Sequence, residues 1–477
     1  YTGKLFRFDQ HYRQFCEAAD YAEAHDWDIL KALREHIEDA YGNGYLAGLA
    51  LAWGKPMEQG LLDSWRIEGI QNQQQFFNAE VKPVLDQAED RRVFVVISDA
   101  FRYEAAEELA GQLNGRYRFE AELTAQLGVL PSYTSLGMAS LLPHETLAYA
   151  ENGSVQVDGA PCSSLDLRKK VLEPVNGIAI KAEEFMGMKK DDGRNFIKPY
   201  RVVYIYHNKV DAVGDSASTE DHTFEAVRTA IDELSDLVGK IINSLNGTLV
   251  LVTADHGFLF QETPPTVTDK NAIANKPTGT VIAKKRYLLG KGLPDNDKAW
   301  HGKTTITAEA AGDIEFWVPK GANRFHFIGG ARFVHGGAMP QEIIVPLIRV
   351  RQLKGKTAVK TKTTTVGVSV LGSNFKVTTN RHRFKLIQTK AVSERVKPIT
   401  LKVAIYEGEQ PVTNVETLTF DSESRDMNEW QKTVNLTLES RAYDKQTVYQ
   451  LILRDAETGV DEACFDVTID LAFTNDF

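Results

Sequence analysis

The chain has 477 residues, of which 43% are hydrophobic and 25% charged, and its net charge is −10. This composition is that of an ordinary globular protein with two or three domains, and the negative charge argues against a general nucleic-acid coat. No apolar run approaches the roughly 18 residues of a membrane span, so we expect no membrane contact. The chain has three cysteines that form no paired motif, Cys16, Cys162 and Cys464. We therefore expect a reducing, cytoplasmic setting, and we expect no cysteine-based zinc site.

The start of the chain, residues 1 to about 90, is predicted to be helical. Apolar side chains in Ile29–Ile37 and in Tyr45–Leu51 recur at the helical period of about 3.6 residues. The segment Gly42–Ala47 has the glycine spacing of a dinucleotide-binding loop, but no strand precedes it, and we interpret it as a helix junction. The chain begins without Met or a signal sequence, so we expect it to be a fragment of a longer protein.

Strands and helices alternate from residue 92 onward, and we expect a catalytic α/β domain over residues 91–354. Continuous β-branched and aromatic runs predict buried parallel strands at Val93–Ile97, Arg201–Tyr206 and Thr248–Val252. Helices are predicted over Glu104–Leu113, from Leu136 to Leu142 and over Phe224–Leu245. This alternation indicates a doubly wound parallel sheet with helices on both faces.

Residues 258–330 interrupt this alternation and are rich in Gly, Pro, Lys and Thr. We interpret them as a cap-like insertion that shapes a substrate pocket, with short strands at Thr280–Ile282 and Arg324–Ile328. The apolar run Ile343–Ile348 is then expected to return to the sheet as its closing strand.

Residues 355–477 are predicted to form an immunoglobulin-like β-sandwich, because short strands separated by turn residues replace the helical periodicity. The expected strands are Val366–Val370, Phe384–Ile387, Ile399–Ile405, Lys432–Leu438, Val448–Leu453 and Cys464–Asp470. Charge is uneven here, with thirteen Lys or Arg and one acid in residues 351–402, and sixteen acids against five bases in residues 403–477. The basic stretch is either a solvated edge or a docking surface for nucleic acid or an acidic partner.

Four short stretches rich in carboxylates and imidazoles lie along the α/β region, and three of them directly follow predicted strands. They are Ser98–Ala100, Asp211–Asp215, Thr253–Gly257 and His335–Gly337. Because the carboxyl ends of parallel strands meet at one edge of a sheet, we expect these side chains to converge and to hold one or two metal ions. Taken singly, each stretch has a structural interpretation as well, such as a helix N-cap at Asp99.

A hydroxyl nucleophile is expected where a helix of small residues begins. Ser132, Thr134 and Ser135 all lie there, close to backbone N–H groups that can bind phosphate, and the pattern leaves the three open. Each of them could instead cap the helix. Arg102 follows Asp99 within one helical turn, where it would neutralise an oxyanion or form an ordinary ion pair.

In this order the motifs resemble the alkaline phosphatase superfamily and, more closely, its PglZ branch. The matching blocks are residues 96–104, 130–143, 206–215, 253–258 and 333–337, within a resemblance that spans roughly residues 90 to 350. The resemblance implies one metal held by Asp99, Asp255, His256 and the nucleophile Thr134, and a second held by Asp211, Asp215 and His335. Asp215 stands where the wider superfamily has His, which leaves the identity of the two divalent ions open, with Zn²⁺ or Mn²⁺ expected.

PglZ proteins belong to bacteriophage-exclusion (BREX) systems, so the resemblance implies phage defence alongside a DNA methyltransferase and ATPase components. We expect a metal-dependent phosphoesterase in which Thr134 attacks phosphorus, and we favour a phosphodiesterase or nuclease that acts on nucleic acid or nucleotides. One alternative is an inactive scaffold with a vestigial metal site, whose helical and β-sandwich parts dock partners. Another is a module that binds phosphate or nucleotide without turnover.

Overall fold

The computed structural model describes residues 1–25, 30–116, 118–263, 266, 270–271, 273, 275–326, 328, 332–353, 363–372, 375–424 and 426–471. The chain divides into two compact units. The first comprises residues 1–113 and 119–353, and the second comprises residues 114–118 and 354–477. Among the described helices, none combines the length and the apolar character that crossing a bilayer requires.

A seven-stranded sheet with the order β1-β3-β15-β9-β2-β8-β7 forms the centre of the first unit. Its strands are β1 Gln71–Asn72, β2 Val93–Ser98, β3 Phe119–Leu127, β7 Gly177–Lys181, β8 Val202–His207, β9 Leu249–Thr253 and β15 Ile344–Gln352. The predicted strands at 93–97, 201–206 and 248–252 therefore exist, and β2, β8 and β9 are parallel neighbours. Strands β2 and β8 are buried along their whole length, as their continuous apolar runs indicate.

The prediction of a wholly parallel sheet is wrong, because β15 runs antiparallel to both of its neighbours, β3 and β9. The reason lies in the connection that leads to it. The chain returns from the insertion past His335 and the short helix α14 Pro340–Ile343, and β15 then begins opposite Leu127, the last residue of β3. A strand that starts at the carboxyl edge of its neighbours can only run the opposite way. The sheet is therefore mixed.

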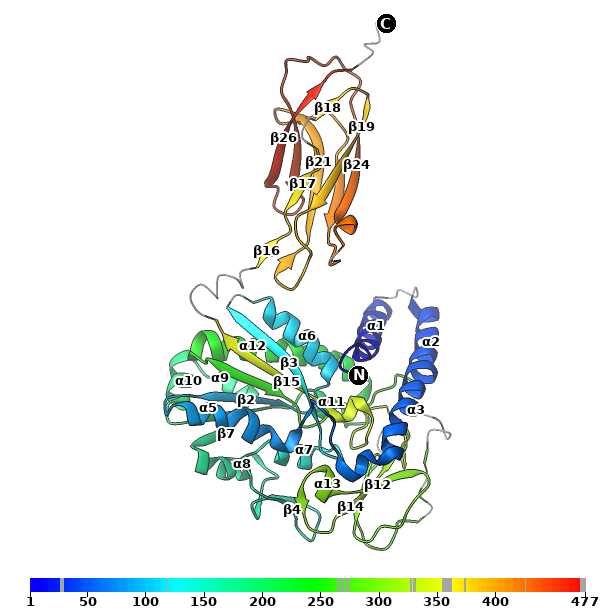
Figure 1. Ribbon diagram of the computed structural model, residues 1–477, viewed down its shortest axis with the longest axis vertical. Helices are drawn as coiled ribbons and strands as arrows, with labels where there is room; N and C mark the ends of the chain where they lie inside the picture. Colours follow the sequence, from blue (N-terminus) through cyan, green and yellow to red (C-terminus); the bar gives the residue numbers. More distant parts are fainter. Residues whose placement is uncertain are drawn as a thin grey trace. The chain divides into compact units, whose positions relative to one another are not determined.

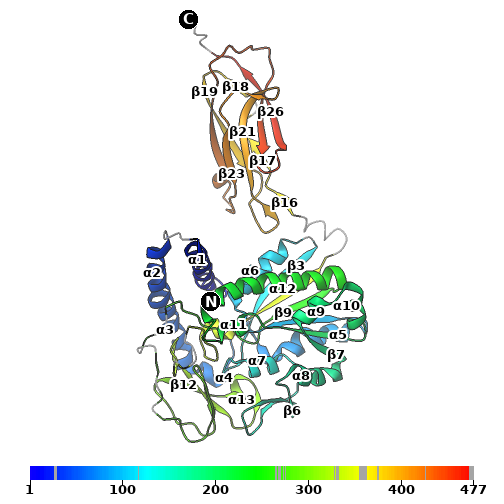
Figure 2. The ribbon, with the colours of Figure 1, turned by 180° about the vertical axis from the view of Figure 1, so that it is seen from behind.

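Helices cover both faces of this sheet, as Figure 1 and the reverse view in Figure 2 show for α6 and α12 on one face and α8 on the other. The first face packs against α6 Tyr103–Asn114, α9 Ala182–Gly187, α10 Lys190–Ile197 and α12 Thr223–Leu245. The second packs against α5 Lys82–Gln87, α7 Thr134–Ser140 and α8 Leu165–Leu172. Successive strand residues alternate between the two cores, so Val96 lies in the first and Val95 in the second.

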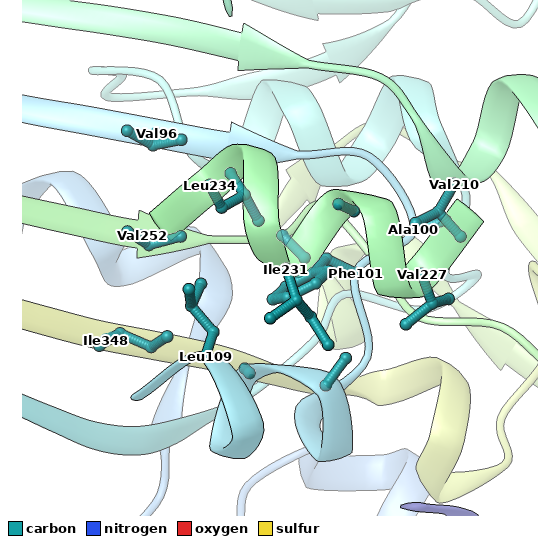
Figure 3. Packing of buried hydrophobic residues seen from close by; sticks show 14 of the residues in the cluster. Val96, Ala100, Phe101, Leu109, Val210, Val227, Ile231, Leu234, Val252 and Ile348 are labelled. Carbon is teal, nitrogen blue, oxygen red and sulfur yellow. The ribbon is translucent and has the colours of Figure 1, made fainter. Parts of the chain in front are cut away.

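The first core is held mainly by α12, whose buried side chains recur along one face. Figure 3 shows Leu234 of this helix beside Val96 and Val252, which lie on neighbouring strands, and Ile231 beside Phe101. Leu234 is fully buried, and truncating such a side chain to Ala costs about 2–5 kcal/mol. This packing fixes the strand ends from which the candidate site is built.

The first part of the chain is largely helical and adds a short strand to the central sheet. In order, its elements are α1 Phe6–Ala24, α2 Lys31–Asp39, a π-helical segment Ala40–Leu46, α3 Ala47–Pro56, a π-helical segment Met57–Leu61 and α4 Leu62–Ser64. After β1 come a 3₁₀ turn Gln73–Gln75, a π-helical segment Phe77–Val81 and α5. The segment Gly42–Ala47 lies inside this helical run and follows no strand. Because β1 pairs with β3, this part belongs to the same compact unit as the sheet.

The insertion contributes all four strands of one small sheet, one strand of a second small sheet, and one short helix. Strands β10 Thr280–Ala283, β11 Leu288–Gly290, β14 Glu315–Pro319 and β12 Ala299–Lys303 form one sheet in that order, and α13 Thr304–Thr307 follows β12. Strand β13 Ala310–Ala311 pairs with β4 Leu147–Tyr149, beside β5 Val155–Val157 and β6 Ala160–Pro161. The strand expected at Arg324–Ile328 is not formed as predicted. Arg324 makes only an isolated bridge with Lys270, and residue 327 lies outside the described residues.

The remaining short elements of the first unit are the 3₁₀ turns Glu173–Val175 and Glu220–His222 and the helix α11 Val210–Gly214. Helix α11 follows β8 directly and carries Asp211.

The second unit consists of strands whose inward side chains form one core. Its longer strands are β17 Val368–Val370, β19 Arg381–Gln388, β21 Ile399–Glu407, β23 Glu416–Phe420, β24 Gln431–Thr437, β25 Tyr449–Asp455 and β26 Asp461–Ile469. Its two-residue strands are β16 Thr364–Thr365, β18 Lys376–Val377, β20 Val396–Lys397 and β22 Gln410–Pro411, and a 3₁₀ turn spans Met427–Trp430. Each of the six predicted runs overlaps an observed strand, whereas β23 and the two-residue strands were not predicted. Strands β17, β19 and β24 form one sheet, and β18, β26, β25, β21 and β22 form another, with β23 on β21.

Candidate metal centre

The first group of candidate ligands consists of Asp99, Asp255 and His256, which follow the neighbouring strands β2 and β9. One ligand atom from each lies within 4.8 Å of the others. Nε2 of His256 lies 3.6 Å from Oδ1 of Asp99 and 3.3 Å from Oδ2 of Asp255. Both of these carboxylate oxygens are buried without a hydrogen-bond partner among the described residues. A buried anion without a partner is costly, so a cation fits between these atoms.

His256 is oriented so that Nε2 faces the two carboxylates. Its Nδ1 lies 2.9 Å from the carbonyl oxygen of Gly257, which assigns the proton to Nδ1 and leaves the lone pair of Nε2 available. Burial lowers the pKa of His256 well below its usual value, and the neighbouring His335 lowers it further. The neutral imidazole is the form that binds metal.

A second group consists of Asp211, His256 and His335, whose ligand atoms also lie within 4.8 Å of one another. Nε2 of His335 lies 3.7 Å from Oδ1 of Asp211, and the rings of His256 and His335 stack with centroids 4.2 Å apart. Oδ1 of Asp211 and Nδ1 of His335 are both buried without a hydrogen-bond partner in the described part of the chain. The two groups share His256, so their candidate ligand atoms form one continuous cluster.

Asp215 differs from the other predicted ligands in its position. Its side chain is exposed, and it belongs to neither group of converging ligand atoms. It lies at the end of α11, where its backbone N–H donates to the carbonyl of Asp211, and it lines the same cavity as Asp211 and His335. The second group therefore includes His256 where the sequence led us to expect Asp215.

The carboxylates of the site are destabilised by burial and by one another. Burial raises the pKa of Asp99 well above its usual value, and the charges of Asp255 and Asp211 raise it further. Burial likewise raises the pKa of Asp255 to about 7, although hydrogen bonds from the backbone N–H groups of Ala100 and His256 oppose this rise. A divalent cation would relieve the repulsion and keep the carboxylates ionised, which is how metal sites behave.

The three hydroxyls proposed as nucleophiles have different surroundings. Thr134 begins α7, and its Oγ1 lies 3.0 Å from Nε2 of His256. The hydroxyl of Ser132 is buried and donates to the carbonyl of Gly337 at 2.6 Å. Ser135 is exposed at the rim of the adjacent cavity. Thr134 is therefore the hydroxyl that directly contacts a candidate metal ligand.

Two backbone features hold the Asp255 loop in place. A Cβ atom on Gly137 would collide with the carbonyl oxygen of Asp255, so α7 packs directly on this loop. Ala100 has a φ of 58°, and its N–H donates to Oδ1 of Asp255 at 3.1 Å. A non-glycine residue in the left-handed region costs roughly 1–2 kcal/mol, which the surrounding structure must offset.

Arg102 lies apart from the candidate ligands. Its Nη2 lies 2.7 Å from Oε1 of Glu104, and its guanidinium group lies 4.6 Å from the ring centroid of Phe258. Arg13 binds the same Glu104, so the three charged side chains form a buried ion-pair network. The contacts described for Arg102 are those of an ion pair, which is one of its two interpretations from the sequence, and none of them is with a candidate metal ligand.

Gln73 supports the site and was not predicted. Its side-chain amide donates to the carbonyls of Ala254 and Asp255, at 3.1 and 2.8 Å, and accepts from the N–H of Val129 at 3.0 Å. It is fully buried and joins the loop after β9 to the loop before α7. A glutamine in a run of three glutamines carries no motif, so the sequence held no signal for this role.

Two cavities open beside the candidate ligands. One, of about 630 Å³, is lined by Thr134, Asp211, Asp215 and His335 and by residues of the insertion. The other, of about 600 Å³, is lined by Asp99 together with residues of α8, α9, β8 and α12. Both volumes lie in the range of pockets that hold small ligands.

The fold and these ligand groups define an α/β protein with a carboxylate-rich candidate metal centre at one edge of its sheet. Residues 76–350 match the family model described as the BREX system PglZ alkaline phosphatase-like domain. The chain belongs to this family, which confirms the resemblance seen in its motifs.

Two curated relatives match the whole chain. It is 45% identical over 483 residues to the alkaline phosphatase-like protein BrxZ of Escherichia coli O9:H4 (strain HS), covering 100% of this chain and 56% of that protein. It is 34% identical over 484 residues to the alkaline phosphatase-like protein PglZ of Bacillus cereus (strain H3081.97), again covering 100% of this chain and 56% of that protein. The chain thus spans about half the length of these relatives.

Solved structures with a similar arrangement include murine and human ectonucleotide pyrophosphatase/phosphodiesterase 5. The murine protein is 9% identical, with a TM-score of 0.38, and the match covers 55% of this chain and 88% of that one. The human protein is 10% identical, with a TM-score of 0.37 and the same coverage.

Proposed function

We propose that this chain carries the hydrolytic site of a metal-dependent phosphoesterase that acts in BREX phage defence. The observation that supports this most is the set of three buried carboxylate oxygens, from Asp99, Asp211 and Asp255, that lie near His256 and His335 without hydrogen-bond partners among the described residues. Such an arrangement is unfavourable without cations and suits divalent ions.

The proposed metal positions follow the predicted ligands. Asp99, Asp255, His256 and Thr134 would hold one ion, and Asp211, Asp215 and His335 the other, with His256 within reach of both. Zn²⁺ and Mn²⁺ fit this mixture of carboxylate and imidazole ligands. When bound, such ions lower the pKa of a coordinated hydroxyl and stabilise the charge on phosphate oxygens.

The chain's own residues supply the nucleophile and its orientation. Thr134 faces the cavity with Oγ1 next to Nε2 of His256, and we propose that this oxygen attacks phosphorus and releases the alcohol of the ester. Water then cleaves the phosphothreonine and restores the hydroxyl. Gln73 and the N–H of Ala100 hold the Asp255 loop in position during both steps.

We infer that the substrate is a phosphodiester of the nucleic-acid or nucleotide class. One cavity is lined by Asp99 and another by Thr134, Asp211 and His335, and together they would leave room for both substituents of a diester. In the second unit, Arg381, Arg383 and Lys385 alternate along the exposed face of β19, and their cross-strand neighbours on β24 are uncharged. A basic strip of this kind can contact a phosphate backbone.

Several wider inferences go with this function. We propose that the second unit is an immunoglobulin-like sandwich and that residues 1–90 are a helical segment leading into the core, both suited to docking partners. The partners would be the methyltransferase and ATPase components of a BREX system, in the cytoplasm.

The decisive experiment measures hydrolysis of bis-p-nitrophenyl phosphate and of DNA with Zn²⁺ or Mn²⁺, together with the metal content of the purified protein. Asp255→Ala should abolish both hydrolysis and metal binding at the first position. Asp313→Ala is the matched control, because Asp313 is an exposed residue that pairs with Lys291. Equal activity in Asp255→Ala would exclude this site, and a protein that binds no metal and hydrolyses nothing would instead favour the scaffold role.

A further inference from the structure

A group of basic side chains lines the same cavity as the candidate nucleophile. We call Lys284, Lys285 and His326 the basic cluster. All three belong to the insertion and line the same cavity of about 630 Å³ as Thr134 and Asp215. Lys284 and Lys285 follow β10 directly, so the small sheet of the insertion fixes their place in the wall.

The surroundings of the basic cluster are strongly positive. Burial lowers the pKa of His326, and four lysines, Lys285, Lys270, Lys276 and Lys284, lower it further. Nδ1 of His326 is buried without a hydrogen-bond partner among the described residues. Like charges gathered in this way repel one another, so an anion bound among them would be stabilised.

The metal centre does not require this positive charge. Its four carboxylates, Asp99, Asp211, Asp215 and Asp255, together carry the charge that balances two divalent cations. Burial lowers the pKa of Lys285, the charges of Asp215 and Glu220 oppose this shift, and the charges of Arg324 and Lys284 add to it. The phosphate that is hydrolysed would lie at the cations next to Thr134. An anion held among Lys284, Lys285 and His326 would occupy the same cavity as that phosphate.

We propose that the basic cluster binds a second phosphate group of the substrate, adjacent to the phosphate that is hydrolysed. This inference rests on the proposed phosphoesterase function and narrows its substrate class to compounds with at least two phosphates. The second phosphate belongs either to the next nucleotide of a nucleic-acid strand or to the polyphosphate of a nucleotide. Lysines suit both sources, because an ammonium group binds phosphate as a point charge from any direction.

The test compares substrates that differ by one phosphate. Dithymidine monophosphate (TpT) has one phosphate, whereas the forms with an added 5′ or 3′ phosphate (pTpT and TpTp) have two. The Mn²⁺-loaded protein should have a kcat/KM for pTpT or TpTp about tenfold higher than for TpT, as one charged hydrogen bond provides. ATP tests the other source of the second phosphate, the polyphosphate of a nucleotide, whereas pTpT and TpTp test the neighbouring nucleotide of a strand.

The variant Lys284→Gln/Lys285→Gln should bring the ratio of kcat/KM between pTpT or TpTp and TpT close to one. Lys291→Gln is the matched control, because Lys291 lies in the same insertion, pairs with exposed Asp313 and does not line the cavity. If the double variant melts at a lower temperature than the parent, the single variant Lys284→Gln, at an exposed position, replaces it.

The outcomes separate this proposal from the proposed function. A parent protein that hydrolyses TpT and both two-phosphate forms equally well, or a double variant with an unchanged ratio, overturns the role of the basic cluster. If the parent hydrolyses none of the substrates, the phosphoesterase proposal fails. In that case, equilibrium dialysis with labelled TpT, pTpT and TpTp tests the basic cluster by binding alone. Equal affinities for all three compounds, in both the parent and the double variant, overturn its proposed role.

Discussion

The two groups of candidate ligands differ in how the fold holds them. Asp99 and Asp255 follow adjacent buried strands, and Asp255 is fixed by two backbone N–H groups and by Gln73. Asp211 lies on a helix of five residues, and Asp215 is exposed beside it. Ligands on strand ends are positioned by the whole sheet, whereas ligands on a short helix and a loop are positioned locally. We therefore expect a rigid first metal position and a more adaptable second one.

The largest expected effect comes from removing the hydroxyl next to the rigid position. Thr134→Val should lower kcat for bis-p-nitrophenyl phosphate on the order of 10³-fold or more, because a nucleophile has no substitute in a two-step reaction. Thr134→Ser should keep most of the activity. Metal content, measured by mass spectrometry, should change little. Full activity in Thr134→Val would contradict this assignment and would favour Ser135 as the nucleophile.

The difference in rigidity between the two metal positions is tested by comparing the variants Asp255→Asn and Asp215→Asn. Asp255→Asn should reduce activity more than about 100-fold, since even the loss of partners that orient metal ligands costs about 10–100-fold. Asp215→Asn should reduce it less than about tenfold, because this side chain is exposed and belongs to neither ligand group. Losses of equal size would show that the two positions are equally rigid.

A smaller effect is expected at the support of the rigid position. Gln73→Ala leaves the carbonyls of Ala254 and Asp255 without their amide donor and should weaken metal binding or activity about 10–100-fold. Gln74→Ala is the control, since Gln74 donates to Glu309 at 3.3 Å. A metal titration of the two variants measures the difference, and identical affinities would remove Gln73 from the site.

The smallest effect concerns the metal-free protein and pH. The pKa of Asp255 is about 7 in the folded protein, whereas an unfolded aspartate has a pKa of about 3.9. The folded state therefore binds the extra proton, so stability is highest at low pH and falls by up to about 1.4 kcal/mol per pH unit between about pH 4 and 7. Urea unfolding in a chelator should show this slope. Asp255→Asn should flatten it, and an equal slope in that variant would assign it to other groups.

The elements that carry the site could be predicted because each produces its own local pattern. The strands β2, β8 and β9 are continuous apolar runs, and α12 has a regular apolar face. We expected the candidate ligands to lie close together because polar residues directly follow these strands in the sequence. The direction of β15 was not predictable in this way, because an apolar run reads the same in both directions.

What the sequence missed at the site depends on contacts between distant segments. Gln73 reaches Asp255 across 182 positions of the chain, and no local pattern marks such a pair. Arg102 is near Asp99 in sequence, but its guanidinium group binds the buried carboxylate of Glu104, which Arg13 binds as well. The position of Arg102 close to Asp99 in the sequence does not determine in which direction its side chain points.

The sharing of His256 between the two ligand groups has a consequence for how the centre fills. Nε2 of this imidazole has one lone pair and can bond to one cation at a time. If two ions bind, the ion that occupies this atom leaves the other position with one ligand fewer, and we expect the two ions to bind in sequence and with unequal strength. The protein can then retain one ion while exchanging the other with its surroundings, which would make its activity follow the supply of free metal.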